Sequence, residues 1–238
     1  LRDAPSNPAE WLHYGGNYQS WRHSPIERLT PESVTDLKLA WMAQTGVPGQ
    51  LEASPVVYDG ILYLTSARNR LLALDAKTGE LYWRYDHPLP DNLRLCCGPA
   101  NRGVAIADDV VLMATLDAKL VALGRKTGVV AWETTIDDYA VGFSATSAPL
   151  VIGDIAVIGV GGGEYGVRGY FDGYDVTSGE RRWRHYTIPA VGEPGAETWA
   201  SESFLHGGGA TWSTGSYDPD TDTLFWTTGN PSPDWNGD

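Results

Sequence analysis

The 238-residue sequence has only two cysteines, Cys96 and Cys97, and they are adjacent. A small secreted fold held together by several disulfides is therefore excluded. The sequence also lacks any run of about 18 apolar residues, the length that a transmembrane helix needs, and Leu1 opens directly into polar sequence. We therefore expect neither a transmembrane helix nor a signal peptide in this chain, as in a mature or trimmed form.

Positive charge is scarce as well. Lys and Arg number 17 against 30 Asp and Glu, which gives a formal net charge of −13. Nucleic acids and anionic membranes bind positive surfaces, so we expect no nucleic-acid partner, and membrane association only through other chains or segments. A small neutral substrate or a basic protein partner fits this charge.

Glycine, proline and tryptophan are abundant, with 28, 15 and 10 copies. Gly and Pro interrupt helices and mark turns, so this composition favours many short strands joined by tight turns. Hydrophobic residues make up 42% of the chain, enough for a sizeable core. The sequence therefore predicts an all-β fold.

One motif recurs along the chain: a Thr-Gly or Ser-Gly pair, with a tryptophan four positions after the glycine. Its three clear copies end at Trp83, Trp132 and Trp183, which are 49 and 51 residues apart. Weaker copies surround Trp41 and Trp226. Repeats of about 40 to 50 residues with four short strands each are typical of β-propeller blades. The sequence predicts four blades or slightly more, each a four-stranded antiparallel sheet.

The repeat also suggests how the blades associate. The glycine provides a turn residue with an unrestricted backbone, and the tryptophan ring can pack between adjacent blades. Each repeat has an earlier strand pair as well, such as residues 55–64, where Asp59-Gly60 is a hairpin turn signal. One short helical turn is expected at residues 30–37, with Thr30 as its cap and Pro31 at its first position.

Five motifs, in order, resemble those of the PQQ-dependent (pyrroloquinoline quinone) methanol and ethanol dehydrogenases. They span nearly the whole chain: residues 11–18 with 22–25, residues 96–103, residues 161–169, residues 207–212 and residues 227–231. The resemblance implies that residues 1–238 are the N-terminal part of a single propeller domain, which has eight blades in the family. It also implies an enzyme, a quinoprotein that oxidises the CH–OH group of alcohols.

The resemblance further implies the residues that bind PQQ. Cys96 and Cys97 would form a vicinal disulfide on one face of the cofactor, and Trp212 would stack on the other. Groups around the rim would satisfy the carboxylates and carbonyls of the quinone. These rim residues are Glu52, Arg102, Thr146, Gly161, Gly162 and Gly163.

A bound metal ion is implied too, Ca²⁺ or a lanthanide, with Glu164 and Asn230 as ligands. Hard cations select such carboxylate and amide oxygens. The general base of the family, an Asp, is expected beyond Asp238, so this chain alone is expected to be inactive. The resemblance also implies a small alcohol as substrate, cytochrome c as electron acceptor and the periplasm as location.

Two other readings remain open. A propeller scaffold of the outer-membrane assembly type shares the Gly…Trp repeat without any chemistry, although it has no reason to keep the adjacent cysteines or the Glu164 and Asn230 pair. A PQQ-dependent sugar or polymer dehydrogenase shares both the fold and the cofactor. The sequence does not identify the alcohol, the metal, the oligomeric state or any cytochrome domain.

Overall fold

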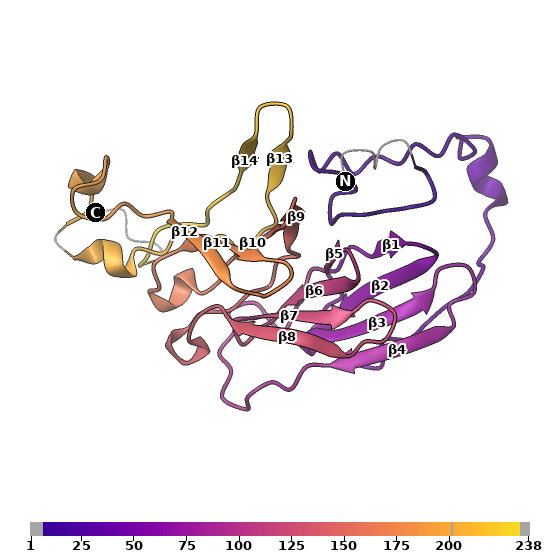
Figure 1. Ribbon diagram of the computed structural model, residues 1–238, viewed down its shortest axis with the longest axis horizontal. Coiled ribbons are helices and arrows are strands. Elements are labelled where there is room, and N and C mark those ends of the chain that lie inside the picture. The colour runs from indigo at the N-terminus through magenta and orange to yellow at the C-terminus, as the bar shows by residue number, and fades with distance from the viewer. Residues whose placement is uncertain (1–6, 201, 234–238) are drawn as a thin grey trace.

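The computed structural model describes residues 7–200 and 202–233, so both ends of the predicted domain lie outside the described residues. It consists of three four-stranded antiparallel sheets and a two-stranded hairpin, in chain order (Figure 1). The predicted all-β fold of propeller blades is confirmed. No helix in the described ranges is long and apolar enough to cross a membrane.

Each complete sheet is a meander in which consecutive strands pair. The first contains β1 (Val56–Tyr58), β2 (Ile61–Ser66), β3 (Arg70–Asp75) and β4 (Leu81–Asp86). The second contains β5 (Ala105–Ala107), β6 (Val110–Ala114), β7 (Lys119–Gly124) and β8 (Val130–Thr135). The third contains β9 (Leu150–Ile152), β10 (Ile155–Gly159), β11 (Tyr170–Asp175) and β12 (Arg181–Tyr186). The fourth blade contributes β13 (Ser216–Asp218) and β14 (Thr223–Phe225).

The third strand of each blade lies between neighbouring blades, whereas the fourth lies at the outside. Strands β3 and β7 each contain four consecutive buried residues, because both of their faces are covered. Strands β4 and β8 alternate between exposed and half-buried residues. Apolar side chains of adjacent blades meet in two clusters, one between the first and second blades and one between the second and third.

Three of the recurring tryptophans, Trp41, Trp83 and Trp132, dock onto the blade that follows them, whereas Trp183 is 37% exposed. The indole Nε1 of Trp83 donates to the carbonyl oxygen of Arg125 at 3.1 Å, and that of Trp132 donates to Val176 at 3.2 Å. Trp41, from a weaker copy, donates in the same way to Ala76 at 3.3 Å. The repeat therefore encodes the interface between blades, as its spacing predicts.

Trp226 does not have this role, although it belongs to the weaker copies. It follows the second strand of its blade rather than lying in a fourth strand, and its ring stacks on Phe171 of β11 with 5.4 Å between centroids. Its Nε1 donates to the carbonyl oxygen of Thr211.

The segment before the first blade crosses to the fourth blade. Trp11 forms paired backbone hydrogen bonds with Val57 of β1, at 2.9 and 2.8 Å, and the backbone N–H of Tyr217 in β13 donates to the carbonyl oxygen of Tyr18 at 2.9 Å. Figure 1 shows this segment beside β1 and β13. The expected helical turn is present as 3₁₀ helix η2 (Ser33–Asp36), but it begins later than predicted, with Glu32 and not Thr30 at the N-cap position. Thr30 Oγ1 still accepts a hydrogen bond from the N–H of Ser33.

Candidate functional site

A cavity of about 370 Å³ lies where several connections between strands meet. In a meander, the connections that follow every second strand lie at the same end of the blades. The lining residues come from the β4–β5, β8–β9, β10–β11 and β12–β13 connections and from the residues after β14. The predicted site residues that line it are Cys96, Cys97, Arg102, Thr146, Gly161, Gly162, Glu164, Trp212 and Asn230.

Two predicted residues do not line the cavity. Glu52 pairs with Arg102, which does line the cavity, and its Oε2 lies 2.7 Å from Nη2. Gly163 is buried, and a Cβ at its position would lie 3.4 Å from the Cβ of Ala210. Because neither Glu52 nor Gly163 lines the cavity, their contacts with the quinone remain predictions.

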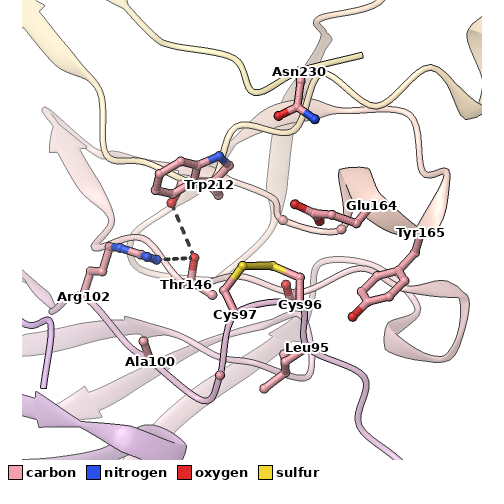
Figure 2. Close-up of a pocket in the computed structure, with 14 residues that line it drawn as sticks. Leu95, Cys96, Cys97, Ala100, Arg102, Thr146, Glu164, Tyr165, Trp212 and Asn230 are labelled. Carbon is pink, nitrogen blue, oxygen red and sulfur yellow. Dashed lines mark hydrogen bonds between the residues drawn. A yellow bond between two sulfur atoms is a disulfide. The ribbon is translucent and has the colours of Figure 1, made fainter. Parts of the chain in front are cut away.

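Cys96 and Cys97 form a disulfide with their Cα atoms 3.8 Å apart, so the predicted vicinal disulfide is confirmed. Both residues are exposed and line the cavity. Figure 2 shows the sulfur pair at the cavity surface, between Thr146 and Tyr165. The ring that this disulfide closes is compact, and it forms one wall of the cavity.

Trp212 provides a second wall and is 45% exposed. Its backbone carbonyl accepts a hydrogen bond from Thr146 Oγ1 at 3.4 Å, and the guanidinium carbon of Arg102 lies 5.0 Å from its ring centroid. Figure 2 shows the indole and the disulfide on different sides of Thr146. An indole left this exposed has a free surface for a planar ligand.

Arg102 is fixed by several contacts around this wall. Its Nη1 donates to Thr146 Oγ1 at 2.8 Å, its backbone N–H donates to the Thr146 carbonyl at 3.0 Å, and Glu52 holds Nη2. The side chain is 18% exposed. A guanidinium has five N–H donors, so Arg102 keeps donors for an anionic ligand while Glu52 and Thr146 orient it.

Close packing of the backbone explains two of the predicted glycines. The Gly161 N–H donates to the carbonyl of Ser144 at 2.8 Å, and a Cβ on Gly161 would lie 2.7 Å from Ser144 Oγ. Gly162 has φ +110°, and a Cβ there would lie 2.2 Å from the carbonyl oxygen of Gly142. Any larger residue would displace this wall, so the glycines are required whether or not they contact a ligand.

Glu164 and Asn230 come from different blades but line the same cavity. Figure 2 shows the carboxylate and the amide on one side of it, across from Arg102. No group of three or more His, Cys, Asp or Glu side chains suited to a metal ion exists within residues 7–200 and 202–233. A cation held here therefore needs further oxygen ligands besides the Glu164 carboxylate and the Asn230 amide.

The sequence did not identify four side chains that also line the cavity, namely Leu95, Ala100, Ser144 and Tyr165. Leu95 and Tyr165 are neighbours of predicted residues, and that adjacency is the only signal that indicates them. Ser144 is buried and has no such signal, because only the bridge between Ser144 and Gly161 brings it to the cavity.

Comparison with known proteins agrees with this geometry. The sequence profile of the glucose/ethanol/alcohol dehydrogenase β-propeller domain, the PQQ family, matches residues 11–238. Quinoprotein alcohol dehydrogenase PedH of Pseudomonas putida is 38% identical over 98% of this chain, which covers 42% of that protein. Quinohemoprotein alcohol dehydrogenase ADH IIB of Pseudomonas putida is 39% identical over 99% of the chain, which covers 36% of that protein.

Solved structures agree as well. A europium-containing methanol dehydrogenase superimposes with a TM-score of 0.92 at 33% identity, covering 97% of this chain and 44% of its own. The chain thus spans less than half the length of the relatives that it matches. From its profile match, its relatives and its fold, the chain belongs to the PQQ family of glucose, ethanol and other alcohol dehydrogenases.

Proposed function

We propose that this chain provides the PQQ-binding part of an alcohol dehydrogenase. The observation that supports this most is the vicinal disulfide and Trp212 in one cavity, with Arg102 at its edge. Two flat walls and a fixed cation suit a planar quinone that has carboxylates. When bound, PQQ supplies an electrophilic quinone carbonyl that takes a hydride from the alcohol.

The residues of the chain fit this cofactor. The disulfide and the indole would hold the ring plane from its two faces and keep water from it. Arg102 would pair with a carboxylate of the cofactor, and its contacts with Glu52 and Thr146 remove the need to reorganise on binding. The glycine wall at Gly161 and Gly162 leaves room at the ring edge.

The metal ion is part of the same proposal, as Ca²⁺ or a lanthanide. Glu164 and Asn230 would supply two of the six to eight oxygens that such hard cations take. The remaining ligands would come from the cofactor and from residues outside this chain. A cation held by Glu164 and Asn230 would supply Lewis-acid stabilisation of negative charge on a bound carbonyl.

The remaining parts of the function are also proposals. The proton of the alcohol would go to an Asp beyond Asp238, because Glu164 is the only carboxylate among the described residues that line the cavity. A cytochrome c in the periplasm would accept the electrons, and the net charge of −13 fits a basic partner. Small alcohols would be the substrates.

Reconstitution of the full-length protein tests the proposal. PQQ and Ca²⁺ should restore a bound-cofactor absorbance, and the cofactor should become reduced on addition of a primary alcohol but not of glucose. Residues 1–238 alone should show no turnover, because general-base catalysis contributes about 10² to 10⁴ in rate. Absence of both cofactor binding and alcohol-dependent reduction in the full-length protein would refute the proposed function.

A further inference from the structure

Glu164 lies in a very short element. The 3₁₀ helix η5 (Gly163–Tyr165) is a single turn between two left-handed glycines, Gly162 with φ +110° and Gly166 with φ +73°. Two backbone hydrogen bonds close it, Tyr165 N–H to Gly162 at 2.9 Å and Gly166 N–H to Gly163 at 3.1 Å. A single turn has little stability of its own, so its position depends on what packs against it.

The β8–β9 connection packs behind this turn at both ends. A Cβ on Gly142 would lie only 2.5 Å from the Cβ of Tyr165, and a Cβ on Gly162 would lie 2.2 Å from the Gly142 carbonyl oxygen. The turn is therefore held on the side of the β8–β9 connection, and His206 Nδ1 also lies 2.9 Å from the carbonyl oxygen of Gly166. The disulfide-bearing β4–β5 connection lies on the cavity side.

Arg94 supplies the contact on that side. Arg94 is two residues before Cys96, and its guanidinium carbon lies 4.8 Å from the centroid of the Tyr165 ring. Arg94 is exposed, and within the described part of the chain it has no ion pair despite the excess of acidic residues. Tyr165 itself lines the cavity, and Figure 2 shows its ring beside Cys96.

We propose that Arg94 is a positioning residue that, by stacking on Tyr165, holds the Glu164 carboxylate in place relative to the disulfide. The stack joins the two connections that carry opposite parts of the site, one with the cysteines and one with Glu164. This inference rests on the proposed function, since it gives Glu164 a cation to bind. Tyr165 links Arg94 to Glu164, because Glu164 and Tyr165 are consecutive residues of the turn.

The sign of the effect separates this role from simple electrostatics. If Arg94 acted only through its charge, its removal would strengthen cation binding, because a nearby positive charge repels the ion. If Arg94 positions Glu164, its removal weakens cation binding. An exposed cation–π contact corresponds to about a two- to fivefold change in affinity.

The experiment titrates the PQQ-loaded full-length enzyme with Tb³⁺, read by sensitised luminescence, and follows amide hydrogen exchange of residues 160–169. In Arg94→Gln, the Kd for Tb³⁺ should rise two- to fivefold and exchange in η5 should quicken, whereas Arg94→Lys should restore both. Arg84→Gln is the control, since it removes an exposed arginine of β4 that does not line the cavity and, in the ranges that the structure describes, pairs only with Asp86. In a Tyr165→Leu background, Arg94→Gln should have no further effect.

Unchanged or tighter Tb³⁺ binding in Arg94→Gln, with unchanged exchange, would overturn the proposal. So would an equal effect of Arg84→Gln, or an undiminished effect of Arg94→Gln in the Tyr165→Leu background. If the wild-type enzyme binds neither PQQ nor Tb³⁺, the proposed function fails. The exchange measurement then still decides whether Arg94 holds η5.

Discussion

Replacing Gly128 with alanine should disrupt the packing of the Trp83 ring against the neighbouring blade. Gly128 has φ +68°, and a Cβ there would lie 2.6 Å from Cε3 of the Trp83 ring. That atom belongs to a rigid indole whose Nε1 donates to the carbonyl of Arg125 at 3.1 Å. The ring must therefore move, and the hydrogen bond moves with it.

The size of the effect follows from its parts. Alanine in the left-handed region costs about 1–2 kcal/mol, displacement of packed atoms about 1–3 kcal/mol, and a weakened hydrogen bond about 1 kcal/mol. Gly153 is the matched control, since it has φ +59° but nothing within 4 Å of its Cβ position. Gly153→Ala should show the backbone cost alone.

The assay is urea unfolding of both variants beside the wild type, followed by tryptophan fluorescence. Gly128→Ala should lower the free energy of unfolding by at least about 2 kcal/mol more than Gly153→Ala does. That excess measures what the docked tryptophan contributes between the blades. Equal losses in the two variants would show that the close contact does not stabilise the interface and that our account of the repeat is wrong.

Three further outcomes are expected. Trp212→Ala should weaken PQQ binding about tenfold through loss of the stacking wall, measured by fluorescence titration, whereas Trp21→Ala, with Trp21 67% exposed, should not. Burial lowers the pKa of His13 to about 4, so the unfolded chain takes up its proton first and stability falls by about 3 kcal/mol as pH drops from about 6.5 to 4. His13→Gln should remove this slope in pH-dependent unfolding, and His23→Gln should keep it. Thiol titration of the unfolded, unreduced protein should find no free thiols, and two would contradict the disulfide.

Local signals predicted most of the fold. The spacing of Trp83 and Trp132 reflects the blade period, because each docked indole packs against a glycine turn on the next blade. Trp226 has Asp222, not a glycine, four positions earlier, and this difference marks it as the weaker copy. Which strand of its blade a tryptophan occupies is known only once the strand pairing is known.

Unusual neighbours made part of the site recognisable, and the resemblance to family motifs supplied other residues, such as Arg102, Thr146 and Trp212. Adjacent cysteines are a rare pattern, and Glu164 follows three glycines, so both can be recognised from the sequence. Ser144 and Arg94 have no such pattern. They reach the site through a backbone bridge and a ring contact between connections far apart in sequence, and those contacts exist only after the blades assemble.

The backbone hydrogen bond between Tyr18 and Tyr217 also constrains the order in which the chain folds. It joins residues 199 positions apart, 18 and 217, so the N-terminal segment is made long before its partner strand. At about 5–20 residues per second, synthesis leaves that segment without β13 for roughly 10 to 40 s. The strands of the first three blades have been synthesised by then, because β12 ends at Tyr186. Closure of this contact is therefore a late event, and its long loop makes it slow compared with the hairpins inside each blade.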